Sequence, residues 1–90
     1  MEIAIIETET NPKNSNQMYF ELKDSIVLNA HIEEAIKKAC RGIENILGVK
    51  MLMIRKKLVG ITITSCGGWK SEDFITTVSD EAVKAIKSKM

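Results

Sequence analysis

The segment from Cys66 to Lys70 combines the residue types in this chain that are best suited to chemistry. Cys66 ends a β-branched run, and two glycines, the single tryptophan Trp69 and Lys70 follow it. Ahead of a helix start, backbone N–H groups and a nearby cation stabilise a thiolate. The same glycine turn also suits an anion, because converging amides and a lysine attract negative charge. Thiol-dependent or anion-dependent activity at Cys66–Lys70 is therefore one hypothesis, and a simple chain reversal is the other.

The rest of the chain gives this turn little catalytic support. General acid–base catalysis typically uses a histidine or a pair of converging carboxylates. His31 is the only histidine, and we interpret it as a solvated residue near a helix start. The chain contains no nucleophile-elbow, P-loop or dinucleotide-binding motif. We therefore expect no catalytic residues and do not expect an enzyme.

The two cysteines, Cys40 and Cys66, do not form a metal-binding pattern. They are far apart in sequence, and one histidine cannot complete a zinc site with them. We expect two reduced thiols, as in a cytoplasmic protein, with an isolated disulfide as the alternative in an oxidising compartment. No metal and no cofactor are expected.

Positive charge gathers in the middle of the chain. Residues 25–57 hold seven basic and three acidic residues, a net of +4, whereas residues 1–24 carry a net of −3. The basic residues form a helical cluster and a turn cluster, which are Lys37, Lys38 and Arg41, and Arg55, Lys56 and Lys57. If these clusters adjoin, six cations would contact phosphates in a salt-dependent manner. Nucleic-acid binding by segment 37–57 is therefore the alternative function, and a solvated basic face is the structural explanation.

Trp69 is also a candidate contact for another protein. Tryptophan is enriched among interface hot spots, and a position after two glycines favours partial exposure. The competing interpretation is a core residue packed over the following helix. Together with Lys70 beside it and Tyr19 on the open face of the predicted sheet, Trp69 forms the partner-binding set that the sequence suggests.

Length and composition indicate one ordinary globular domain, 1–90. The chain has 90 residues, 44% apolar and 28% charged, with a net charge of +1. Such a length supports one modest hydrophobic core. No apolar run approaches the length of a membrane span, and residues 1–4 do not resemble the start of a signal peptide. A cytoplasmic protein without a membrane partner is the expectation.

Two strands occupy the first part of the chain. Glu2–Thr10 is rich in isoleucine and threonine, and Gln17–Lys23 alternates apolar and polar side chains. The loop 11–16 between them holds the only proline, so antiparallel pairing is expected. A bulge or bend is expected at residues 24–25.

An amphipathic helix follows, with Asn29 as its N-cap and Gly48 as its end. Its apolar stripe has the spacing of a helix packed on a sheet. The stripe comprises Ile32, Ala35, Ile36, Ala39, Cys40, Ile43, Ile46 and Leu47. Gly42 falls inside this helix, where glycine is unfavourable, so a closely packed neighbour is expected there.

Two further strands are predicted at Val49–Ile54 and Leu58–Ser65. The residues between them lack the Asn-Gly of a tight hairpin, so one long bent strand over 50–65 is the alternative.

The last element is a helix capped by Ser71, with acidic residues in its first turn. Strand propensity at 75–78 leaves an alternative, a short strand followed by a helix capped by Ser79. The apolar residues that repeat every four positions and favour the helix are Phe74, Val78, Ala82, Ile86 and Met90.

The predicted order is β-β-α-β-β-α, an α+β domain with a mainly antiparallel four-stranded sheet and two helices on one face. The open face and the two sheet edges need protection or a partner, so a homodimer is expected. The leading hypothesis is a small non-enzymatic protein–protein interaction module, an adaptor, regulator or inhibitor of a macromolecular partner.

Overall fold

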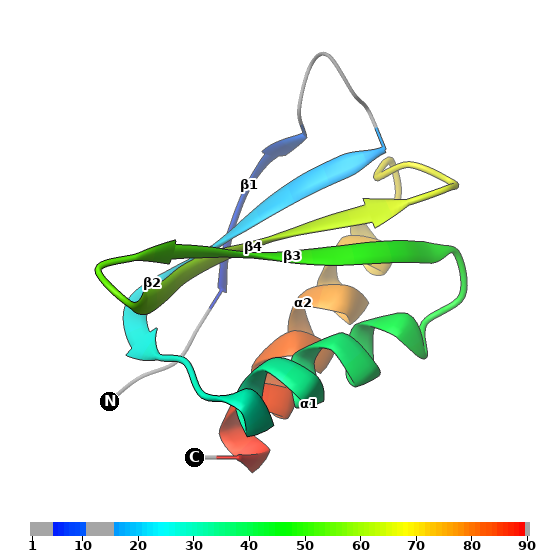
Figure 1. The fold of residues 1–90 in the computed structure, drawn as a ribbon. Helices are drawn as coiled ribbons and strands as arrows, with labels where there is room; N and C mark the ends of the chain where they lie inside the picture. Colours follow the sequence, from blue (N-terminus) through cyan, green and yellow to red (C-terminus); the bar gives the residue numbers. More distant parts are fainter. Residues whose placement is uncertain (1–4, 11–15, 90) are drawn as a thin grey trace.

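The computed structural model describes residues 5–10 and 16–89, and it confirms the α+β class (Figure 1). The elements, in order, are β1 (Ile5–Thr10), β2 (Gln17–Val27), α1 (Ala30–Arg41), β3 (Ile46–Ile54), β4 (Lys57–Ser65) and α2 (Glu72–Ser88). Residues 2–4 of the predicted first strand and 11–15 of the predicted loop lie outside the described residues.

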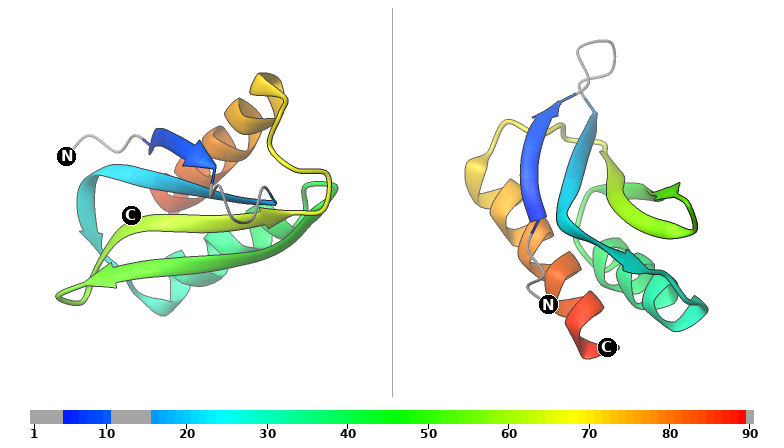
Figure 2. Two further views of the ribbon diagram at one scale, coloured as in Figure 1. Left: turned by 90° about the horizontal axis from the view of Figure 1, so that it is seen from above. Right: turned by 90° about the vertical axis from the view of Figure 1, so that its left-hand side faces the viewer.

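The strands pair antiparallel in the order β1-β2-β4-β3. β4 lies between β2 and β3, and β3 therefore forms one edge of the sheet. Both helices cover the same face, as the two further views also show (Figure 2). The opposite face of the sheet has no covering layer among the described residues.

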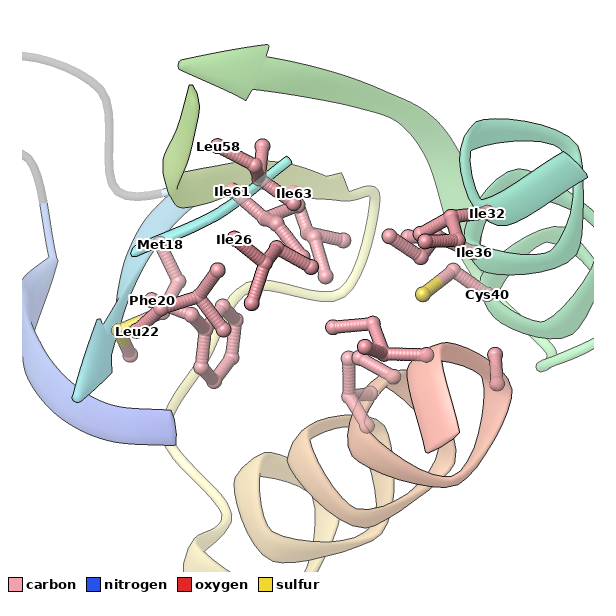
Figure 3. Close-up of a cluster of buried hydrophobic side chains, with 14 of the residues drawn as sticks. Met18, Phe20, Leu22, Ile26, Ile32, Ile36, Cys40, Leu58, Ile61 and Ile63 are labelled. Atoms are coloured by element: carbon pink, nitrogen blue, oxygen red, sulfur yellow. The ribbon is translucent and has the colours of Figure 1, made fainter. Parts of the chain in front are cut away.

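The core lies between this sheet and the two helices (Figure 3). The alternation expected in β2 is confirmed, because Met18, Phe20 and Leu22 are all buried. Each fully buried side chain of this size contributes about 1.5–3 kcal/mol relative to an exposed one. Helices α1 and α2 contribute Ile32, Ile36 and Cys40, and Val78, Ala82, Ala85 and Ile86.

The expected irregularity in β2 is present. Its pairing with β4 changes register between Glu21 and Ile26, which lie opposite Gly60 and Leu58. The pairing of β3 with β4 also shifts where β4 passes from Leu58 to Gly60. Against β2 the extra residues lie in β2, between Glu21 and Ile26, whereas against β3 Val59 is the extra residue of a bulge. Such features bend and twist a sheet locally.

The first helix is shorter than predicted. Asn29 is its N-cap, as expected, and accepts a hydrogen bond of 2.9 Å from the Ile32 N–H. The helix ends at Arg41, and Gly42 is its C-cap rather than an interior residue below a close neighbour. Asn45 then takes a positive φ of 77°, a conformation that asparagine tolerates and that stops a helix.

The prediction of a helix that ends at Gly48 is therefore wrong, and Ile43 lies in the connection after the helix. Ile46 and Leu47 open β3, which runs to Ile54 as one strand. Their spacing also fits a helix, but Ile46 lies opposite Ser65 and Gly48 opposite Thr64, so pairing with β4 decides the structure of this segment.

A tight hairpin joins β3 to β4, so the alternative of one long bent strand is wrong. Arg55 and Lys56 form the turn with φ values of 53° and 66°. Two central residues with positive φ match the right-handed twist of the strands on either side.

The second helix starts where predicted. The Ser71 hydroxyl accepts a hydrogen bond of 3.3 Å from the Phe74 N–H. Residues 74–78 are helical, which overturns the alternative of a short strand there. Val78, Ala82 and Ile86 are buried at helical spacing, and this packing outweighs the local strand propensity.

Candidate functional site

The indole of Trp69 lies in the core and is 5% exposed. Its Nε1 donates a hydrogen bond of 2.9 Å to the Asn16 carbonyl. The ring meets Phe20 edge to face at a centroid distance of 5.5 Å and lies 5.0 Å from Phe74. A buried indole with a satisfied N–H offers no anchor to a partner.

The exposed orientation expected for a partner-binding Trp69 is therefore contradicted, and the core interpretation is correct. Gly68 takes a φ of 77° in the turn after β4. This turn carries the chain across the end of the sheet, and the indole enters the space between β2 and α2.

Cys66 is exposed and lies beside Asn45. Its Sγ is 3.4 Å from Asn45 Oδ1, and its backbone N–H donates to the Asn45 carbonyl at 2.9 Å. His31 follows β2 closely, and β2 ends opposite the first residue of β4. Cys66 follows the last residue of β4. The nine residues of that strand span about 26 Å, so the histidine and the thiol lie at opposite ends of the sheet.

A small hollow of about 230 Å³ adjoins the start of α2. Its lining comprises Asn45, Ser65, Gly67, Gly68, Lys70, Ser71 and Phe74. Lys70 supplies a cation, but Glu72 and Asp73 in the first helical turn add two negative charges. Acidic side chains are favourable at a helix N-terminus, and at this position they repel a bound anion.

Ser65 does not make this hollow a better site for an anion. Its Oγ is fully buried and has no hydrogen-bond partner among the described residues. Ser65 is among the residues that line the hollow, but a neutral hydroxyl does not offset the negative charges of Glu72 and Asp73. The Cys66–Lys70 turn places Trp69 in the core and leads into α2.

Cys40 lies in the core, as expected from its place on the helical stripe (Figure 3). Burial, with a smaller effect from the Glu81 carboxylate, raises the pKa of the Cys40 thiol to about 11. This thiol is protonated and enclosed at neutral pH, so it behaves as a small apolar side chain.

The two basic clusters do not form one patch. Arg41 ends α1 and precedes β3 by a short connection, whereas Arg55 and Lys56 form the turn at the other end of that strand (Figure 1). The nine residues of β3, about 26 Å long, lie between the segment that follows Arg41 and this turn. Lys37 is also paired with Glu33 at 2.9 Å. The six-cation surface that segment 37–57 suggested is therefore not assembled within one chain.

Tyr19 is half-buried on the face opposite the helices, because its neighbours Met18 and Phe20 point into the core. It pairs with Thr62, and its ring lies over Gly60, where a Cβ would overlap the ring. Burial, with an added effect from Glu21, raises the pKa of the Tyr19 hydroxyl. Lys70 is exposed on the loop before α2. The structure does not gather Tyr19 and Lys70 around an exposed indole.

The edge strand β3 carries an exposed apolar surface. Four of the five large apolar side chains exposed in the described part of the chain belong to it. They are Leu47, Leu52, Met53 and Ile54, and they are between 40% and 65% exposed. Lys50 is the one charged residue of this strand. Long apolar edges are normally shortened or charged, since they pair readily with another strand.

A shallow groove of about 490 Å³ separates the outer surfaces of α1 and α2. Its apolar floor is made by Ala35, Ala39 and Ala85, and lysines from both helices stand at its rim. Nothing further in the described residues indicates an occupant.

Residues 5–10 and 16–89 hold no group of three His, Cys, Asp or Glu side chains arranged to bind a metal ion. No helix in the same part of the chain is long and apolar enough to cross a membrane. Comparisons with protein-family models, with curated proteins and with solved structures found no match.

Proposed function

We propose that this protein is a small non-enzymatic interaction module. Its partner supplies an extended segment, which pairs as an additional strand with the free edge of β3. The supporting observation is the concentration of exposed apolar side chains on that strand. Strand addition takes its affinity from main-chain hydrogen bonds and its specificity from alternate side chains. An adaptor or inhibitor role is consistent with this mode of binding, because neither needs catalytic residues.

The surface proposed here replaces the set centred on Trp69. β3 is the outer strand of the sheet, and β4 pairs with its inner edge without an extra residue in β3 from Gly48 to Ile54. A strand held in this way is preorganised for pairing, so little conformational entropy is lost when a partner binds.

Affinity capture with paired variants tests the proposal. Leu52→Lys/Ile54→Lys places charge on the β3 edge at two exposed positions, so folding should be preserved. Val27→Lys is the matched control, because Val27 is equally apolar and 68% exposed but belongs to β2. Proteins retained by the wild type and by Val27→Lys should be lost with the β3 variant. Equal retention by all three would contradict the proposed surface.

Nucleic-acid binding is the second proposal, and the separation of the two basic clusters weakens it. An electrophoretic mobility shift measured over a salt series tests it directly. Absence of binding at low salt would remove this function.

A further inference from the structure

We infer that the strand added to β3 is the β3 of a second copy, paired antiparallel around a twofold axis at Met51. This inference rests on the proposed function and names its partner. The two copies would then share one continuous sheet with all four helices on the same side.

The register within the chain defines where such pairing is regular. Ile46 lies opposite Ser65 and Gly48 opposite Thr64, so Leu47 is an extra residue that bulges from β3. From Gly48 to Ile54 the strand has no extra residue of its own. Met51 is the centre of this regular stretch. A twofold axis there places Gly48 opposite Ile54 of the second copy and Met51 opposite Met51.

Where the two β3 strands would pair, which we call the seam, the side chains on the helix side of the sheet are apolar. Val49 and Met51 lie opposite Ile63 and Ile61 of β4, which point into the core. Met53, 40% exposed, lies opposite Leu58 on the same face. Residues directly opposite in an antiparallel pair share a face, so Met53 would pack against Val49 of the second copy. Of the exposed apolar side chains of β3, this arrangement covers Met53, whereas Leu52 and Ile54 lie opposite Lys50 and Gly48 of the second copy.

Charge also selects this register. An axis at Lys50 would place two ammonium groups directly opposite each other, which destabilises a strand pair. The axis at Met51 places Lys50 opposite Leu52 of the second copy. The cationic turn at Arg55 and Lys56 would then lie beside the start of the other β3, which the acidic residue Glu44 precedes. A parallel arrangement would bring the two cationic turns together.

The seam is small. It consists of one strand edge and the side chains beside it, well below the roughly 1,200–2,000 Å² buried in stable complexes. The dimer is therefore reversible, and its detection needs a concentration series.

A charge-matched pair of variants tests both the dimer and its register. Sedimentation equilibrium should show a monomer–dimer equilibrium for the wild type. Leu52→Lys sets a second cation against Lys50 of the other copy and should raise the Kd several-fold, since two such contacts occur in each dimer. Leu52→Glu sets a carboxylate there and should lower the Kd several-fold. Val27→Lys should leave the Kd unchanged, and urea unfolding should show that all three variants fold.

The contradicting outcomes separate this inference from the proposed function. A wild type that stays monomeric up to millimolar concentration overturns the second copy as partner, while capture of another protein through β3 would still support strand addition. A dimer that ignores both Leu52 variants overturns the β3 surface and, with it, both proposals. Equal weakening by Leu52→Lys and Leu52→Glu overturns the register centred on Met51.

Discussion

The indole N–H of Trp69 and the backbone carbonyl of Asn16, 53 positions apart in the chain, form a hydrogen bond of 2.9 Å. The same carbonyl accepts the Ser65 N–H at 2.8 Å. One carbonyl before β2 thus holds both the end of β4 and the loop that leads into α2. Trp69 closes the core at this end of the sheet, and its replacement should affect folding rather than recognition.

Trp69→Ala should lower the free energy of unfolding by about 3–5 kcal/mol, the cost of removing a buried aromatic side chain. Trp69→Phe keeps a ring beside Phe20 and loses the bond to Asn16, so a smaller cost of about 1–2 kcal/mol is expected. Urea unfolding followed by circular dichroism measures both. Lys70→Ala, an exposed neighbour, serves as control and should change stability by less than about 0.5 kcal/mol. A fully stable Trp69→Ala variant would place the indole outside the core.

Gly60→Ala should destabilise the protein by about 1–2 kcal/mol, because the new methyl group displaces the Tyr19 ring from the open face of the sheet. The cost should shrink in a Tyr19→Ala background, since contacting residues do not act additively. A double-mutant cycle from urea unfolding gives this coupling. Additive effects would show that the ring does not lie over Gly60 in solution.

Replacing Arg55 and Lys56 by Asn and Gly should stabilise the hairpin. Both residues have positive φ, a conformation that costs residues other than glycine and asparagine about 1–2 kcal/mol. The Asn-Gly pair is the preferred sequence for such a turn, and a gain of about 1 kcal/mol is expected. The control Arg55→Ala/Lys56→Ala removes the same charges but keeps side chains at both positions. If the control variant gains as much stability as the Asn-Gly variant, relief of charge repulsion rather than backbone conformation is responsible.

Stability should fall at alkaline pH because of Cys40. Its thiol has a pKa of about 11 in the folded protein against an ordinary value of 9.0. Below pH 9 the thiol is protonated in both states and its contribution is constant. Between pH 9 and 11 the unfolded chain loses this proton first, so the free energy of unfolding decreases with pH, by about 1.4 kcal/mol per unit at most.

Urea unfolding over this pH range, compared with Cys40→Ala, isolates that effect from the other groups that titrate there. The variant should show a shallower decline than the wild type. Parallel declines would mean that Cys40 is not buried as a neutral thiol.

The fold class was predictable because most elements carry their own local signals. Ser71 and Asn29 are strong helix caps, and the alternation around Phe20 is typical of a half-covered strand. The end of the first helix was mispredicted because Ile46 and Leu47 satisfy a helical spacing by coincidence. Gly42 and Asn45 together were the available stop signal.

The candidate surface was less accessible from the sequence. The composition of β3 is visible in the chain, but its position at the sheet edge follows from β4 returning between β2 and β3. That order depends on contacts between distant segments, which no local pattern reports. For the same reason the burial of Trp69 was not predictable, because it depends on contacts with Phe20 and Asn16 far earlier in the chain.

Amide hydrogen exchange of the wild type at micromolar and at millimolar concentration tests the central claim most directly. Pairing through β3 predicts slower exchange between Gly48 and Ile54 at the higher concentration, with β4 unchanged because both its edges are already paired. Unchanged exchange in β3 at both concentrations, or new protection at another surface, would contradict the account.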